Sequence, residues 1–390
     1  MTKEKGIPQI RFSGFTDTWE QRKLSAIADK VTEKNGLQYI ETFTNSAEFG
    51  IISQRDFFDH DIAKMSSLGG YYIVRSEDFV YNPRISTSAP VGPINRNKLG
   101  RIGVMSPLYT VFRPHDIDTT YLEYFFKSKY WHSFMNFNGD SGARSDRFSI
   151  KDSVFFEMPI PIPHIDEQKK IGEYLAYLDR LITLHQRKYD KLTKVKKAML
   201  EKMFPKNGSL YPEIRFKGFT DAWEQRKLGD IASDMVAGGD IDKDLILAEG
   251  QYPVIANALT GDGIVGYYDK EYRVNAPAVT VTGRGDVGHA KARLVNFTPV
   301  VRLLSVKSEH DVFFLENVIN TLKIVIESTG VPQLTVPQLA KYEVAFPRQL
   351  DEEEHIGAFF KQLDHLITLH QRKLEKLKNI KKACLEKMFV

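Results

Sequence analysis

The chain has 390 residues, of which 42% are hydrophobic; this suits two to four folded domains and excludes a disordered or collagen-like protein. Its single cysteine, Cys384, excludes an internal disulfide and a multi-cysteine zinc site. A formal net charge of +4 is only mildly basic, so charge alone is weak evidence for nucleic-acid binding.

The first residues lack the apolar core of a signal peptide, and no run approaches the roughly 20 apolar residues that span a bilayer. We therefore expect a cytoplasmic protein without membrane contact.

Two segments of the chain occur twice. Residues 8–28 recur at 212–232 with 16 of 21 positions identical, and residues 166–204 recur at 351–389 with 24 of 39 identical. The first pair is offset by 204 residues and the second by 185, so the region between the repeats is shorter in the second half. We call 8–28 and 212–232 the leading motifs. This pattern predicts a pseudo-twofold internal repeat.

The regions between the repeats have little sequence similarity to each other. We call residues 29–165 the first variable region and residues 233–350 the second variable region. Apolar runs predict strands within 69–82 and 101–114 and a helix over 119–135, then strands within 250–258, 276–283 and 298–306 and a helix over 313–328. Both regions are therefore expected to be mixed α/β domains with curved sheets.

The repeated segments at 166–204 and 351–389 have the pattern of a coiled coil. The seam positions, three and four residues apart, are Ile171, Leu175, Leu178, Ile182, Tyr189, Leu192, Met199 and Met203, then Ile356, Phe360, Leu363, Ile367, Leu374, Leu377, Cys384 and Met388. His185 and His370 are equivalent seam positions. Two long antiparallel helices of about 57 Å are expected, at about 1.5 Å per residue. The alternative is that each helix packs only on its own variable region.

The expected organisation has four stretches. They are 1–165 (leading motif and first variable region), 166–204 (first spacer helix), 205–350 (linker, second leading motif and second variable region) and 351–390 (second spacer helix).

Residues that are identical in both copies but not needed for packing indicate a repeated partner surface. The candidates for partner binding are Trp19, Arg22, Gln186, Arg187, Lys188, Trp223, Arg226, Gln371, Arg372 and Lys373. The alternative explanation is a recent duplication that has not yet diverged.

Polar and cationic loops of the variable regions are candidate DNA contacts, because Arg and Asn pair with base edges while Ser, Thr and Lys bind phosphates. The candidates are Asn82, Arg84, Ser86, Arg96, Lys98, Arg101, Arg144 and Arg147 in the first variable region, and Arg284, His289, Lys291, Gln333 and Thr335 in the second.

Catalytic patterns in the sequence are incomplete. Residues 81–84 (Tyr-Asn-Pro-Arg) resemble the loop of amino methyltransferases but lack the aromatic residue that stacks on a flipped base. The glycines of 283–288 lack the lysine and hydroxyl of a phosphate-binding loop. The histidines show no metal-ligand spacing, and the acidic run at 351–354 suits a helix N-terminus. We therefore expect no catalytic residues and no metal site.

The duplicated FxGFTxxWEQRKL motif, at 12–24 and 216–228, and the two LITLHQRK helices resemble the specificity subunit of type I restriction–modification enzymes. The stretches SGARSDRFSIKD and STGVPQLTVPQL also resemble target recognition domains of this family. The resemblance covers essentially the whole chain.

The resemblance implies that each variable region recognises one half of a gapped, bipartite site on double-stranded DNA, with the long helices setting the gap. It also implies two modification subunits that methylate adenine with S-adenosylmethionine and two restriction subunits that use ATP and Mg. No cofactor is then expected in this chain. Two other hypotheses stay open: a single-chain methyltransferase or nuclease, and a protein-binding adaptor without DNA contact.

Overall fold

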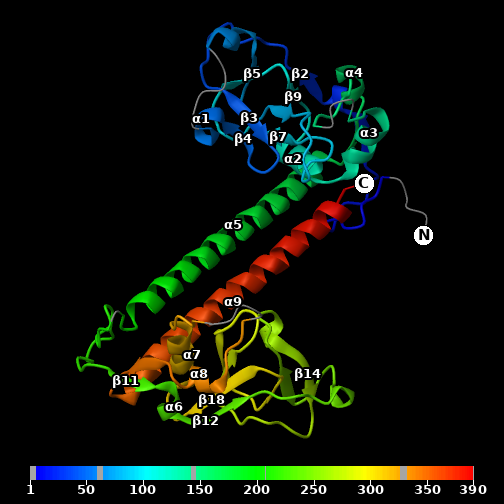
Figure 1. Ribbon diagram of the computed structural model, residues 1–390. Helices are drawn as coiled ribbons and strands as arrows, with labels where there is room; N and C mark the ends of the chain where they lie inside the picture. Colours follow the sequence, from blue (N-terminus) through cyan, green and yellow to red (C-terminus); the bar gives the residue numbers. More distant parts are fainter. Residues whose placement is uncertain (1–5, 59–64, 142–145, 207, 326–331, 390) are drawn as a thin grey trace. The chain divides into compact units, whose positions relative to one another are not determined.

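The computed structural model describes residues 6–58, 65–141, 146–206, 208–325 and 332–389 (Figure 1). The chain divides into two compact units. Unit 1 contains residues 1–184 and 373–390, and unit 2 contains residues 185–372. Each unit therefore combines one variable region with parts of both long helices.

Unit 1 is built on an antiparallel four-stranded sheet in the order β2-β9-β6-β7, with three smaller pairs among the described residues, β1-β10, β3-β4 and β5-β8. Its strands are β1 (Glu20–Lys23), β2 (Ala28–Lys30), β3 (Phe43–Ser46), β4 (Gly50–Ser53), β5 (Tyr72–Val74), β6 (Phe79–Tyr81), β7 (Ile94–Arg96), β8 (Gly103–Met105), β9 (Thr110–Pro114) and β10 (Pro159–Ile162). Its helices are α1 (Gln54–Phe57), α2 (Thr119–Lys127), α3 (Tyr130–Asn138) and α4 (Asp152–Phe155), with short 3-10 turns at Leu24–Ala26 and Met65–Gly70.

Unit 2 repeats this plan with an antiparallel sheet in the order β12-β18-β15-β16 and a mixed three-stranded sheet, β14-β13-β17. Its strands are β11 (Glu224–Lys227), β12 (Ala232–Ala237), β13 (Tyr252–Ile255), β14 (Ile264–Tyr268), β15 (Ala278–Thr282), β16 (Ala290–Arg293), β17 (Thr298–Pro299), β18 (Leu303–Ser308) and β19 (Glu343–Phe346). Its helices are α6 (Leu228–Ile231), α7 (Val312–Asn320) and α8 (Val336–Leu339), with 3-10 turns at Lys243–Leu245 and Gly261–Gly263.

The two four-stranded sheets have the same topology. In chain order, β2, β6, β7 and β9 correspond to β12, β15, β16 and β18, and the last strand leads into α2 or α7. An aspartate caps each of these helices, Asp118 in unit 1 and Asp311 in unit 2, by accepting hydrogen bonds from backbone N–H groups of the first turn. The two variable regions thus share a fold that their sequences do not show.

The long helices are α5 (Ile165–Lys202) and α9 (Leu350–Lys387), as the seam predicts. They pack antiparallel within each unit: Asp179 of α5 bonds to Lys381 of α9 in unit 1, and Lys196 bonds to Asp364 in unit 2. These two pairs are equivalent under the 185-residue offset. Antiparallel coiled-coil packing is therefore confirmed inside both units.

His185 and His370 meet in unit 2, with their Nδ1 atoms 2.8 Å apart. Each is the other's counterpart in the repeat, so equivalent positions of the two helices contact each other in unit 2.

Each unit is closed by segments from both copies of the repeat. In unit 1, the Ile10 N–H of the first leading motif donates to the carbonyl of Lys387 at the end of α9. In unit 2, Ile214 of the second leading motif donates to Lys202 at the end of α5. These bonds satisfy carbonyls that a helix C-terminus leaves free. The units therefore cut across the four consecutive stretches expected from the sequence.

The leading motifs form the same buried ion pair in both units. Arg11 binds both carboxylate oxygens of Glu167, at 2.7 and 2.8 Å, and Arg215 binds those of Glu352, at 2.6 and 2.7 Å. The hydrogen bond to the carboxylate is the largest cause that raises the pKa of each arginine, against the opposing effect of burial. Each leading motif is thereby held at the start of a long helix.

Several elements are shorter than the apolar runs predict. The helix expected over 119–135 is two helices, because Ser128 takes an extended conformation and its hydroxyl bonds to the Phe125 carbonyl. The run 69–82 forms β5 and β6 around Glu77 at φ 73°, and 298–306 forms β17 and β18 around Arg302 at φ 71°. The helix expected over 313–328 is α7, which ends at Asn320.

Candidate functional site

In the first variable region, the loop after β6 lies against the segment that precedes α4. Arg84 and Arg147 form an isolated antiparallel bridge, and the Phe148 N–H donates to the carbonyl of Pro83 at 2.7 Å. Both arginines are exposed, whereas Phe148 is buried in the core. Arg147 also lines a polar hollow of about 410 Å³ with Lys30 and other residues.

The second variable region has a bridge of the same kind between Arg284 and Gln333. The Leu334 N–H donates to the carbonyl of Gly283 at 2.8 Å, and Leu334 is buried. Arg284 is exposed, while Gln333 is half-buried and accepts a hydrogen bond from Arg302 at 2.7 Å. Two candidate contacts that are 49 residues apart in sequence therefore lie side by side.

The candidate contact Arg96 must be corrected. Its guanidinium is 9% exposed and forms ion pairs with Glu77 of the preceding turn and Glu123 of α2. Arg96 is thus neutralised inside the protein and holds α2 against β7. Lys98 also binds Glu123, and Arg101 binds Glu41, but both of these cations are about half-exposed.

Glu123 lies at the centre of this cationic cluster. Burial alone would raise the pKa of Glu123, but Lys127, Arg96 and Lys98 outweigh burial and lower the pKa from 4.5 to about 2. A carboxylate with a depressed pKa stabilises the fold above about pH 4.5, and this contribution is lost as the pH falls toward 2.

We therefore expect acidification from pH 5 to pH 3 to destabilise unit 1 by about 2 kcal/mol through Glu123 alone. Urea unfolding at the two pH values, followed for unit 1 by hydrogen exchange, measures the loss. The Glu123→Gln variant, although less stable at pH 5, should lose less on acidification because it has no carboxyl to protonate. Equal losses in both proteins would contradict the assignment.

Other candidate contacts have structural partners. The Asn82 side chain donates to the Asn45 carbonyl and accepts from the Arg84 N–H. These bonds stabilise the loop at residues 81–84, whose sequence resembles the loop of amino methyltransferases. The candidate DNA contact Thr335 must be corrected, because it forms a capping box with Gln338 at the start of α8.

The remaining loop candidates are more accessible. Ser86 is exposed and within hydrogen-bond distance of Ser88. His289 lies 3.0 Å from Asp286, and Lys291 lies 3.5 Å from Asp262, with both basic side chains about half-exposed. Arg144 lies outside the described residues.

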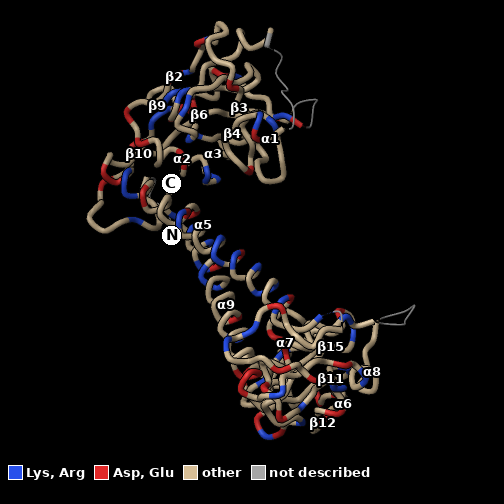
Figure 2. The backbone as a smooth tube through the Cα atoms, turned by 90° about the vertical axis from the view of Figure 1, so that its left-hand side faces the viewer, with Lys and Arg blue, Asp and Glu red and all other residues tan. Residues whose placement is uncertain are grey.

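The partner-binding prediction must be corrected at Trp19 and Trp223. Both indoles are buried in the core of their units, at 6% and 1% exposure, so their identity in the two copies reflects shared packing. The other candidates are accessible to different degrees: Arg187, Lys188, Arg226, Gln371, Arg372 and Lys373 are exposed, while Arg22 and Gln186 are half-buried. Figure 2 shows lysines and arginines along α5 and α9.

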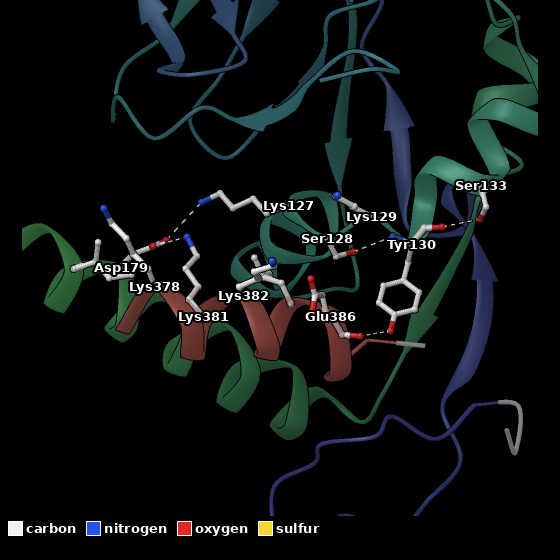
Figure 3. Close-up of a pocket in the computed structure, with 12 residues that line it drawn as sticks. Lys127, Ser128, Lys129, Tyr130, Ser133, Asp179, Lys378, Lys381, Lys382 and Glu386 are labelled. Atoms are coloured by element: carbon white, nitrogen blue, oxygen red, sulfur yellow. Dashed lines mark hydrogen bonds and ion pairs between the residues drawn. The ribbon is translucent and has the colours of Figure 1, made fainter. Parts of the chain in front are cut away.

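Unit 1 contains a basic pocket that the sequence alone did not indicate (Figure 3). It has a volume of about 750 Å³ and lies between the α2–α3 turn and the two long helices. Its charged residues are Lys127, Lys129, Asp179, Lys378, Lys381, Lys382 and Glu386. Lys127 and Lys381 form ion pairs with Asp179, and Tyr130 donates to the Glu386 carbonyl. With five lysines against two carboxylates, the lining of the pocket has a net positive charge.

The repeated Lys-Lys-Ala stretch indicates only some of the residues that line this pocket. Lys381 and Lys382 have counterparts in Lys196 and Lys197, but Lys127 and Lys129 come from the first variable region. In unit 2, a different hollow of about 560 Å³ lies along α5 and includes Arg187 and Lys194.

Among the described residues, no group of three or more His, Cys, Asp or Glu side chains is arranged to hold a metal ion. No helix in the described part of the chain is both long and apolar enough to cross a membrane.

The chain thus has a duplicated frame that carries two variable regions of one sheet topology, each with a polar bridge. The family model described as the type I restriction modification DNA specificity domain matches residues 16–194 and 220–379. These matches span most of the chain, which therefore belongs to this family.

The chain is similar to proteins named as type I specificity subunits. One from Mycoplasma pneumoniae is 25% identical over 359 residues, covering 90% of this chain and 88% of the relative. One from Methanocaldococcus jannaschii is 23% identical over 427 aligned residues, covering 97% and 95%. The crystal structure of a type I restriction–modification S subunit from M. genitalium has a TM-score of 0.67 at 14% identity, covering 98% and 99%, and shows the same fold.

Proposed function

We propose that this chain is the DNA-recognition subunit of a type I restriction–modification complex. Each variable region recognises one half of a bipartite, gapped DNA site, and the chain itself carries no catalytic residues and no cofactor. Two modification subunits methylate adenine with S-adenosylmethionine, and two restriction subunits cleave with ATP and Mg. The complex works in the cytoplasm on double-stranded DNA, without membrane contact.

The duplication carries this proposal. Two regions of the same sheet topology differ in sequence, yet they are attached to leading motifs and long helices that are largely identical. A shared fold with different surface residues is what two different half-sites require, because base edges are recognised by particular side chains. The identical frame is what two copies of one partner require.

The surfaces that we assign to the modification subunits are the exposed repeat residues Arg187, Lys188, Gln371, Arg372 and Lys373, together with the basic pocket of unit 1. The long helices set the gap between half-sites. Each has 38 residues, which gives about 57 Å, and half-sites on one face of DNA lie roughly 34 Å apart.

An exchange of the first variable region tests the proposal. Residues 29–165 are replaced by the corresponding region of a specificity subunit that recognises a different site, and the chimera is expressed with the modification subunits. Single-molecule sequencing of the genomic DNA then gives the methylated motif. We expect one half of the motif to change, while the other half and the gap are kept.

The reciprocal exchange of residues 233–350 is the matched control and should change the other half. A motif that keeps both halves after either exchange, or changes both after one, contradicts the proposal. A methyltransferase within this chain would instead methylate DNA without added modification subunits.

A further inference from the structure

The polar bridges in the two variable regions are structurally equivalent. Each follows a strand, β6 or β15, at the same place in the same sheet order. In each, the residue before the arginine accepts a backbone hydrogen bond from the buried residue that follows its bridge partner. Arg84 therefore corresponds to Arg284, and Arg147 corresponds to Gln333.

The arginines at these bridges differ from the other described arginines of the variable regions. In the first region, Arg75, Arg96, Arg101 and Arg113 all form ion pairs with carboxylates. Among the described residues, no ion pair forms at the guanidinium of Arg84 or Arg147, and the same holds for the exposed Arg284 of the second region. In the second region Arg348 pairs with Glu224, while Arg273, Arg293 and Arg302 donate to neutral oxygens. The bridge arginines therefore stand apart among the described arginines of the two regions, because their guanidinium groups make neither kind of bond.

Arg84 and Arg147 are directly opposite each other across their bridge. Directly opposed residues in an antiparallel pair lie on one face, and like charges in this arrangement repel. A phosphate of the DNA backbone bound at one of the two guanidinium groups would relieve that repulsion.

We propose that each bridge is a two-residue DNA contact with divided roles. The position occupied by arginine in both regions (Arg84 and Arg284) binds a phosphate at the same place in each half-site. The position that differs between the regions (Arg147 and Gln333) contacts a base edge. This inference rests on the proposed function, and it goes further by naming which side of the bridge carries specificity.

The division of roles follows from the comparison of the two regions. A residue that is the same in both regions cannot distinguish two different half-sites, but it can fix both regions on the backbone in the same way. The opposite residue is an arginine in one region and a glutamine in the other, and both types pair with base edges. The Gln333 oxygen accepts from Arg302, which leaves its amide N–H₂ group to donate.

DNA binding over a range of salt concentrations tests the roles of Arg84 and Arg284. We compare a specific and a random duplex, using the complex of this chain with its modification subunits. We expect Arg84→Ala and Arg284→Ala to weaken binding to both duplexes by the same factor and to reduce the salt slope by about 0.9. Arg84→Lys should restore the slope. Arg75→Ala is the control, because Arg75 is half-exposed but paired with Glu33.

The differing position should behave otherwise. Arg147→Ala should weaken binding to the specific duplex by roughly 5- to 150-fold and leave random DNA within a factor of about three. Arg147→Gln should change the methylated motif at one position of one half-site only.

The proposed function and the division of roles can be contradicted separately. A wild-type complex that shows no preference for any duplex would overturn the proposed function. If the wild-type complex prefers its site, the Arg84→Ala variant tests the division of roles alone. That division would be overturned if the variant bound as wild type, or if it lost affinity only for specific DNA. An unchanged motif with Arg147→Gln would also overturn it.

Discussion

Replacing Glu352 by glutamine should destabilise unit 2 by about 3–5 kcal/mol, because it removes one partner of a buried ion pair. Glu352 is 1% exposed and its two oxygens accept from Nε and Nη2 of Arg215, which is itself 13% exposed. A glutamine offers one oxygen and places an N–H₂ group against the second guanidinium N–H. The charge of Arg215 then stays buried without a counter-charge.

Hydrogen exchange of the intact chain measures this loss, since it reports each unit separately. Protection of residues 212–232 should fall in Glu352→Gln, while unit 1 stays as in wild type. Glu354→Gln is the matched control: Glu354 is exposed on the same turn, and its removal should change stability by no more than about 0.5 kcal/mol. Equal protection in the two variants would show that the pair contributes little.

The long helices could be predicted from sequence because their signal is local and repeated. Apolar residues at alternating steps of three and four placed helices at 166–204 and 351–389, and the structure has 165–202 and 350–387. Ten of the sixteen seam residues, such as Ile171 and Leu363, are buried, and the other six are half-buried. The offset of 185 also identified His185 and His370 as equivalent seam positions, and these two residues contact each other.

The candidate site could be predicted only in part, because a cation count does not show which cations are neutralised. Arg96 and Arg84 both lie in polar stretches of the sequence, but Arg96 ends strand β7, where it pairs with Glu123 of α2. Among the described residues, no carboxylate pairs with Arg84. Repetition also has two causes. It marks surfaces that bind the same partner, and it marks shared cores, as at Trp19 and Trp223.

The equivalence of Arg84 and Arg284 was hidden for a different reason. Their offset is 200 residues, while the flanking repeats have offsets of 204 and 185. Only the strand order and the backbone hydrogen bonds place the two residues at one position of a common fold.

A Phe389→Ala variant should lose about 3–5 kcal/mol of stability in unit 1, although Phe389 lies in the second copy of the repeat. Its ring is 1% exposed and packs against Tyr121 and Phe125 of α2, with centroids 5.6 and 6.0 Å away. Removing it leaves a cavity under the helix that follows the first sheet. Phe137→Ala is the control, because Phe137 is 89% exposed on α3 of the same unit.

Phe204 makes the reciprocal contact. It ends the first copy of the repeat but packs in unit 2 against Trp223, Phe314 and Phe360. Hydrogen exchange should therefore show lost protection at 119–127 in Phe389→Ala and at 312–320 in Phe204→Ala, each without effect on the other unit. If both variants weakened the same unit, the inference that each unit is completed by a helix end from the other half of the chain would be wrong. If the losses separate as expected, each variable region folds only on a frame completed by the other half of the chain, which explains why the leading motifs and helix ends stay alike while the variable regions differ.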